Sequence, residues 1–130
     1  MNEYKKEDII KYRIARAFES LDEANLLAKA DHWNTVANRL YYSCFYIVKA
    51  LLIKNDISAS THSGVKSQFF KHFIKTEILN VSIGKLFSDL SDKRQEGDYQ
   101  PLYYFDKESI FPLIEQVKSY INAINEFLSD

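Results

Sequence analysis

The sequence is poor in the residues that make turns and cross-links. Its 130 residues include three glycines, two prolines and one cysteine. Sheets need frequent turns, and turns depend on glycine and proline, so this shortage favours helices over many strands. The lone cysteine, Cys44, excludes an internal disulfide and on its own makes no metal site. We expect it to be a buried structural thiol.

Long apolar runs are also missing. No segment approaches the roughly 18 apolar residues of a membrane-spanning helix. The first residues, MNEYKKEDIIKY, lack the apolar core of a signal peptide. We therefore expect a cytoplasmic protein that contacts no membrane. The length fits one domain, residues 1–130, with enough chain to bury a core.

Charge is balanced over the whole chain but not along it. The formal net charge is −1, yet residues 33–76 carry six basic and one acidic side chain. Residues 77–130 carry five basic and ten acidic side chains. A basic surface attracts phosphate groups. Alternatively, the two segments pack side by side and neutralise each other.

Apolar residues recur at steps of three and four, which indicates amphipathic helices. The first helix is expected from about Lys6 to Ala30. A second, capped by Asp31 or Asn34, should run to about Lys54.

Three more helices follow by the same pattern. Thr61 or Ser63 is expected to cap a short helix through VKSQFFKHFIKT. The next runs from Ser82 to Glu96, where Gly97 supplies a left-handed cap. The last begins near Asp106 or Lys107. The first and last helices have stripes that repeat every 3.5 residues, typical of neighbours in a bundle. The predicted fold is all-α: an antiparallel up-down bundle of four to five helices.

Common enzyme motifs are absent. The sequence has no GxxxxGK[ST], GxGxxG, HExxH or CxxC pattern. Its histidines, His32, His62 and His72, form no helical pair that would hold a metal. We therefore predict neither a metal nor a cofactor.

Aromatic residues are abundant, with nine tyrosines, nine phenylalanines and one tryptophan. Most are expected to pack in or around the core. Tyr42 lies three residues after Arg39, so the two are neighbours on one helical face. Arg39 is either a salt-bridged structural residue or part of a groove in which a base stacks on tyrosine.

Three motifs occur in a recognisable order: NRLYYSCFYIVKALL (38–52), THSGVKSQFFKHFIKT (61–76) and KRQEGDY (93–99). Together they supply the patterns [SN]RxYYxxF, THSG and RxxxDY. In this combination the sequence resembles a small single-domain subgroup of the HEPN family, over roughly Ala15 to Leu128.

This resemblance implies an antiparallel helical bundle that forms a homodimer. Many members of the superfamily are metal-independent RNases, and others are inert RNA- or nucleotide-binding modules. Several are the toxin of a toxin–antitoxin pair whose antitoxin is a minimal nucleotidyltransferase.

The RNase motif of the superfamily is an arginine followed, four to six residues later, by a histidine. Carried over, the arginine is Arg94, and Tyr99 stands where the histidine would be. Arginine binds phosphate as a planar fork. A tyrosine with a pKa near 10 is a poor base at neutral pH. His62 is the best substitute among the histidines.

Other roles follow from the same motif. Tyr99 is a candidate hydrogen-bond donor, or an acceptor for adenylylation by a partner nucleotidyltransferase. Asp98 is a candidate to orient Arg94 through a charge-assisted pair. Arg39, Tyr42 and His62 are candidate binding residues.

The sequence thus predicts an RNA- or nucleotide-binding HEPN protein, the partner of a minimal nucleotidyltransferase in a toxin–antitoxin type system. Two alternatives stay open: a metal-independent endoribonuclease toxin that uses Arg94, and a non-catalytic protein-interaction module.

Overall fold

The computed structural model describes residues 5–129, and within that range every regular element is helical. Four long helices are α1 (Lys6–Lys29), α2 (Trp33–Lys54), α4 (Val81–Tyr99) and α5 (Lys107–Leu128). Between α2 and α4 lie the short α3 (His62–Phe69) and a π-helical segment, η1 (Phe70–Ile74). The predicted all-α fold is confirmed.

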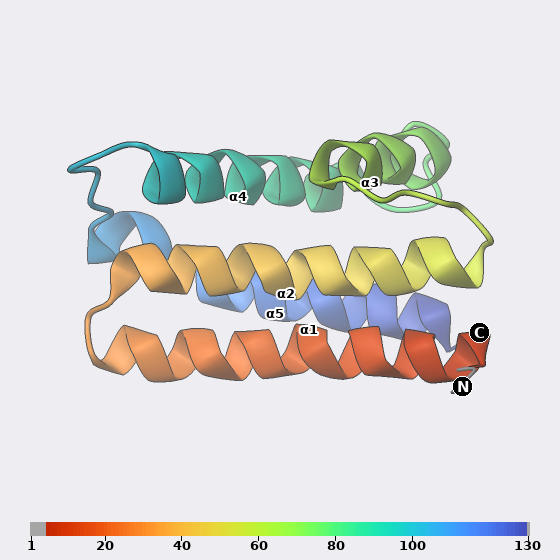
Figure 1. Ribbon diagram of the computed structural model, residues 1–130, viewed down its shortest axis with the longest axis horizontal. Coiled ribbons are helices and arrows are strands. Elements are labelled where there is room, and N and C mark those ends of the chain that lie inside the picture. Colours follow the sequence, from red (N-terminus) through yellow and green to blue (C-terminus); the bar gives the residue numbers. More distant parts are fainter. Residues whose placement is uncertain (1–4, 130) are drawn as a thin grey trace.

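Helix α2 lies at the centre of the bundle. In Figure 1, α1 runs along one side of α2, α4 and α3 lie on the other side, and α5 lies behind it. Consecutive long helices run in opposite directions, which is the predicted up-down arrangement, and the connection from α2 to α4 contains α3 and η1. No helix among residues 5–129 is long and apolar enough to cross a membrane.

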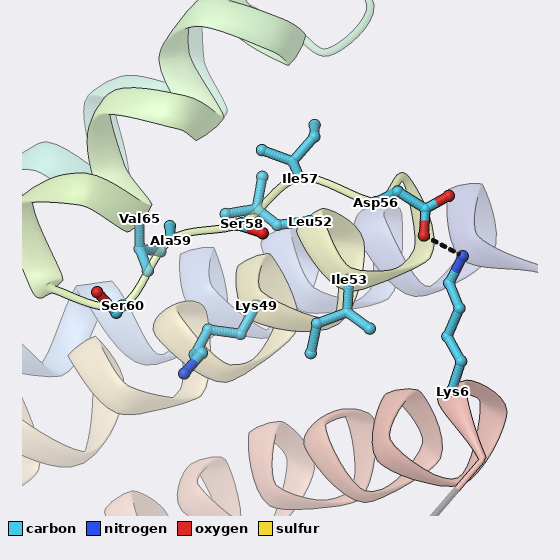
Figure 2. Close-up of a pocket in the computed structure, with 10 residues that line it drawn as sticks. All are labelled: Lys6, Lys49, Leu52, Ile53, Asp56, Ile57, Ser58, Ala59, Ser60 and Val65. Atoms are coloured by element: carbon cyan, nitrogen blue, oxygen red, sulfur yellow. Dashed lines mark hydrogen bonds and ion pairs between the residues drawn. The ribbon is translucent and has the colours of Figure 1, made fainter.

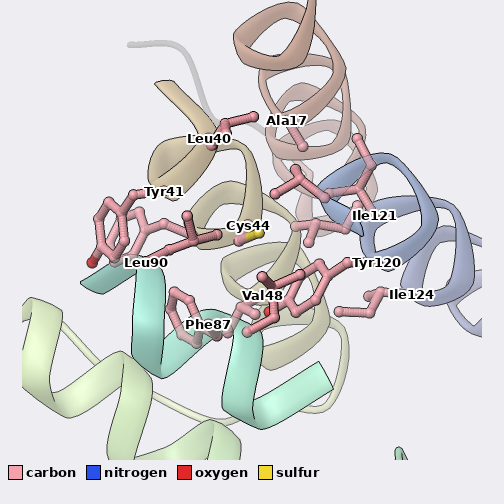
Figure 3. Packing of buried hydrophobic residues seen from close by; sticks show 14 of the residues in the cluster. Ala17, Leu40, Tyr41, Cys44, Val48, Phe87, Leu90, Tyr120, Ile121 and Ile124 are labelled. Carbon is pink, nitrogen blue, oxygen red and sulfur yellow. The ribbon is translucent and has the colours of Figure 1, made fainter. Parts of the chain in front are cut away.

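The core gathers around the buried face of α2. Leu40, Cys44 and Val48 of this helix are completely buried. Figure 3 shows them packing between Phe87 and Leu90 of α4 on one side and Tyr120, Ile121 and Ile124 of α5 on the other. Cys44 is buried as expected, and burial raises the pKa of its thiol well above the usual value.

Small residues bring α1 and α2 close together. Ala17 and Ala24 of α1 are fully buried, and the Ser43 hydroxyl donates a 2.7 Å hydrogen bond to the Ala17 carbonyl. A serine that bonds to another helix in this way fixes the axial position of the two helices relative to each other. As a result, the polar residues of α1 face defined positions of α2.

Two of the predicted helix ends are wrong. Neither Asp31 nor Asn34 caps α2: Asp31 has a φ of 60°, and Asn34 lies inside the helix. The Asn34 side chain instead bonds the loop after α4, donating to the Tyr103 carbonyl at 2.7 Å and accepting from the Phe105 amide at 2.8 Å. Of the two candidates for the cap of α3, Thr61 is the cap and accepts from the Gly64 amide. The predicted start of the last helix is confirmed, and Asp106 caps it by accepting from the Ser109 amide.

The end of α4 is the second error. The helix continues through Gly97 to Tyr99, and no glycine of the described chain has a positive φ. Gly97 is there for space, because a Cβ on it would lie 3.1 Å from the Phe105 ring. The glycine therefore admits the returning loop instead of turning the chain.

Candidate functional site

A cluster of aromatic rings covers the face of α2 that points toward α3 and α4. Tyr41 is buried, and its ring lies 5.7 Å from Phe45 and 5.1 Å from Tyr42. The Phe87 ring of α4 stacks on Tyr41 at 5.8 Å. These rings form a rigid wall, because core packing restrains Tyr41 and Phe45.

Arg94 extends from α4 onto this wall. Its guanidinium carbon lies 4.8 Å from the centre of the Tyr41 ring and 6.0 Å from that of Tyr42. The side chain is only 8% exposed, and its Nε has no hydrogen-bond partner within residues 5–129. A buried arginine normally has an acidic partner, since burying a charge is costly. Arg94 has no ion pair with any described residue.

His62 completes the cluster from the opposite side. It is the first residue of α3, and Thr61 caps that helix by accepting from the Gly64 amide at 2.9 Å. The His62 Nδ1 lies 2.7 Å from the Tyr41 hydroxyl, and its ring stacks on Phe45 at 4.5 Å. Tyr41 thus contacts both Arg94 and His62.

The electrostatics of the cluster are positive. The pKa of His62 is lowered by burial and by the nearby positive charges of Arg94 and Lys49. The pKa of Tyr41 is raised, mainly by burial, so its phenol stays neutral and keeps a proton for hydrogen bonding. An anion bound here would relieve the mutual repulsion of these cations.

Arg39 is held by a polar chain next to the cluster. Its guanidinium donates to the Asn38 side chain at 2.7 Å and to Glu23 of α1 at 3.3 Å. It also lies 5.1 Å over the Tyr42 ring. These contacts are those of a salt-bridged structural residue, the first of the two alternatives for Arg39. The guanidinium nevertheless lies next to Tyr42, at the edge of the aromatic cluster.

The two residues after Gly97 lie elsewhere. Tyr99 is 70% exposed, whereas Arg94 is buried, as expected for positions about 140° apart on a straight helix. Because α4 continues through Gly97 instead of ending in a left-handed cap, Tyr99 does not fold back toward Arg94. Asp98 does not pair with Arg94 either; its carboxylate accepts from Asn38 at 3.3 Å.

Sequence reasoning missed Tyr41, Phe45 and Lys49 as neighbours of the predicted residues. A signal was present, since NRLYYSCFY places two adjacent tyrosines after an arginine. Which of the two tyrosines contacts Arg94 depends on which one faces α4. The helical period of α2 alone does not give this, because it does not say on which side of α2 the helix α4 packs.

The arrangement is suited to bind an anion and an aromatic ring together. Arg94 supplies positive charge, Arg94 and His62 supply hydrogen-bond donors, and Tyr42 supplies a half-buried ring for stacking. Within residues 5–129 no group of three or more metal-binding side chains comes together.

The chain is an all-α bundle in which a buried arginine, without an ion pair among the described residues, lies against a tyrosine–histidine pair. The HEPN domain model matches residues 10–127, so the chain belongs to the HEPN family.

Relatives cover most of this chain. The "UPF0332 protein" of Thermotoga maritima is 39% identical over 130 residues, which span 100% of this chain and 97% of the relative. The "Putative toxin MJ0142" of Methanocaldococcus jannaschii is 33% identical over 125 residues, spanning 96% of this chain and 84% of the relative. A "UPF0332 protein" of Gloeobacter violaceus is 30% identical over 115 residues, spanning 88% and 91%.

Proposed function

We propose that this chain is the toxin-type HEPN component of a two-protein system and that it binds a phosphate group of RNA or of a nucleotide between Arg94 and His62. One observation carries the proposal: Arg94 is buried without an acidic partner, on a tyrosine that also bonds His62. The M. jannaschii relative's name supports the toxin role.

Each residue has a distinct part. Arg94 binds the phosphate oxygens as a planar fork, and its stacking on Tyr41 fixes the plane of the guanidinium. His62 donates from the ring nitrogen that does not face Tyr41. Tyr42 stacks against the base, with Arg39 on its other side.

The partner in this proposal is a minimal nucleotidyltransferase, and the chain acts as a homodimer. Tyr99 is the proposed acceptor of the adenylyl group, because its exposed ring is accessible to another protein. In adenylylation, the Tyr99 phenol oxygen would attack the α-phosphorus of ATP, lose its proton to a base on the partner and release pyrophosphate. A bulky anion on the end of α4 would then repel RNA.

Binding by purified protein tests the proposal. Titration with labelled single-stranded RNA and with nucleotides at low salt should give saturable binding. Arg94→Gln should weaken it at least tenfold, since a hydrogen bond to a charged group contributes about 1.5–3 kcal/mol. His62→Gln should also weaken binding. The matched control is His72→Gln, because His72 bonds Gln68 on the outer side of α3 and η1.

The proposal is wrong if neither ligand class binds wild type, or if Arg94→Gln binds as well as wild type does. Recovery of a nucleotidyltransferase together with the chain from its native host tests the partner. Loss of adenylylation in Tyr99→Phe tests Tyr99 as the acceptor.

A second candidate function, a metal-independent endoribonuclease, is favoured by the position of His62. Tyr99 cannot serve as the motif histidine from the outer face of α4, but His62 lies beside Arg94. In such a reaction His62 would take the proton of a ribose 2′-hydroxyl. That oxygen would attack the phosphorus, and the 5′-oxygen would leave with a proton supplied by water, giving a 2′,3′-cyclic phosphate.

Incubation with RNA in excess chelator tests this activity. Cleavage should disappear in both His62→Gln and Arg94→Gln and persist in His72→Gln and Tyr99→Phe. Because burial and, to a lesser extent, the charges of Arg94 and Lys49 lower the pKa of His62, the base form should persist to lower pH than for a free histidine. RNA that stays intact under all conditions, while still binding, would leave the chain as a binding module.

A further inference from the structure

Charged side chains follow the line where α1 and α2 lie side by side. At one end Lys6 bonds Asp56 at 2.9 Å, and at the other Arg39 bonds Glu23 at 3.3 Å. Between them lie Arg13 and Lys49, and neither forms an ion pair with any residue in the described range. The ends of this line are neutralised, and Arg16 pairs with Glu19 at 3.3 Å, whereas Arg13 and Lys49 are left without an acidic partner among the described residues.

Lys49 and Arg13 are close enough to repel each other. Burial and the charge of Arg13 both lower the pKa of Lys49. The Arg13 Nε is buried and has no hydrogen-bond acceptor within residues 5–129. Two cations without an acid are unfavourable, and a bound anion would stabilise both.

The ring of Phe45 connects this pair to the Arg94–His62 site. The Lys49 ammonium lies 5.6 Å from the centre of the Phe45 ring, and the His62 ring centre lies 4.5 Å from the same point. The two groups are therefore no more than about 10 Å apart. Neighbouring phosphates of one RNA strand can contact two groups separated by such a distance.

A cleft opens beside Lys49. It has a volume of about 610 Å³, within the range of roughly 300–1,000 Å³ for small-molecule sites. Its wall is apolar at Ile53, Ile57 and Val65, and Ser58 and Ser60 line it from the connecting segment (Figure 2). In Figure 2, Lys49 lies at one end of the cleft and the Lys6–Asp56 pair at the opposite end.

We propose that Lys49 and Arg13 bind a second phosphate of a single-stranded RNA whose first phosphate lies at Arg94 and His62, and that the cleft takes the nucleoside next to it. This inference rests on the proposed function. The apolar wall suits a base, and the serine hydroxyls suit polar groups of the sugar or base. A lysine suits a phosphate as a point charge that needs no fixed geometry.

The spacing favours a strand over a nucleoside diphosphate. The two phosphates of a diphosphate share one bridging oxygen, so they span only a small part of the upper limit of about 10 Å between Lys49 and His62. The phosphates of a 5′-phosphorylated dinucleotide span more of it, because a ribose separates them. The ligand of this cleft is therefore the continuation of an RNA chain.

Binding measurements with three probes test the inference: uridine 5′-monophosphate, uridine 5′-diphosphate and the 5′-phosphorylated dinucleotide pUpU. Wild type should bind pUpU about tenfold more tightly than the monophosphate, as expected for one added charge-assisted contact. The diphosphate should gain little. Lys49→Gln and Arg13→Gln should each remove most of the gain, and each should weaken monophosphate binding much less than pUpU binding.

Salt dependence supplies a second readout. For single strands the slope of log K against log salt changes by about 0.7 for each phosphate contact, so Lys49→Gln should lower its magnitude for pUpU by about that amount. Lys118→Gln is the matched control, because it makes the same charge change on an exposed position of α5. Circular dichroism confirms that each variant is folded.

The outcomes separate the two proposals. If wild type binds none of the probes, both fail. If it binds pUpU and the monophosphate equally, or gains as much with the diphosphate, only the second phosphate site is wrong. The second phosphate site is also wrong if Lys118→Gln loses as much affinity for pUpU as the two variants in the cleft.

Discussion

The two ends of the RxxxDY motif differ sharply, although only four residues separate them. Arg94 lies on the inner face of α4, buried against Tyr41, whereas Tyr99 lies on the outer face, 70% exposed. Both belong to one uninterrupted helix. The difference shows that spacing along a chain becomes proximity only when the helical phase allows it.

The same comparison explains why a residue elsewhere in the chain lies closer to the Arg94–Tyr41 contact than the residue at position 99 does. A residue five positions after Arg94 faces away from it, but the N-terminus of α3 faces the wall of α2. His62 therefore reaches the Tyr41 hydroxyl from a distant part of the sequence. Tertiary packing brings Arg94 and His62 into one cluster. His62 lies outside the motif of residues 94–99, so that motif alone does not form the cluster.

The largest expected difference between the two faces of α4 is in stability. Leu90, one turn before Arg94, is completely buried between α2 and α4, so Leu90→Ala should cost about 2–5 kcal/mol. Tyr99→Ala should change the free energy of unfolding by less than about 0.5 kcal/mol. Urea unfolding followed by circular dichroism measures both. Equal losses would mean that the outer face is covered by contacts beyond those within one chain.

Replacing Arg94 should produce a smaller change in stability and a larger one in function. Arg94→Met keeps the length and apolar stem, removes an unpaired buried charge, and exchanges a cation–π contact for a sulfur–aromatic one. The free energy of unfolding should therefore stay within about 1 kcal/mol of wild type, since apolar replacements of buried charges are often neutral or stabilising. Phosphate binding should be lost.

Arg94→Ala is the companion variant, because it also removes the packed stem and should be less stable than Arg94→Met. A loss above about 3 kcal/mol in Arg94→Met would show that the guanidinium holds the bundle together and would argue against a binding role.

The sequence predicts most of the helices because their stripes are long and regular. The stripe of α5, from Ile110 to Leu128, is buried as its period indicates, and so is that of α2 around Cys44. The caps at Thr61 and Asp106 are also predictable, since the bond is made within three residues. Local rules suffice wherever the interaction itself is local.

The errors lie where a residue serves a distant partner. Asn34 has the composition of a helix cap but bonds the loop at Tyr103 and Phe105, some 70 residues away. The His62–Tyr41 bond and the Arg94–Tyr41 stack are likewise contacts between different elements. A short sequence window contains only one of the two residues that form each contact. Periodicity therefore identifies candidate residues but not the distant residues that they contact.

The smallest expected effect is at Gly97, and the order of two variants distinguishes its possible roles. Inside a helix alanine is more favourable than asparagine by roughly 0.5 kcal/mol. At a left-handed cap the order reverses, because asparagine tolerates positive φ. Since α4 continues through Gly97, Gly97→Ala should be more stable than Gly97→Asn. Thermal unfolding of both variants measures the order.

The absolute effect of Gly97→Ala depends on the Phe105 ring. A new Cβ would lie 3.1 Å from Phe105 Cε2, which requires a shift of the ring. Phe105 is only partly buried and belongs to the loop after α4, so it can move, and the helical preference for alanine offsets the cost. Gly84→Ala is the control: its Cβ would meet Ile74 and Phe70 at 3.1 Å on the packed side of α4. It should therefore destabilise the protein more than Gly97→Ala does. If Gly97→Asn were more stable than Gly97→Ala, position 97 would have a positive φ, and the chain would turn there and place Tyr99 near Arg94.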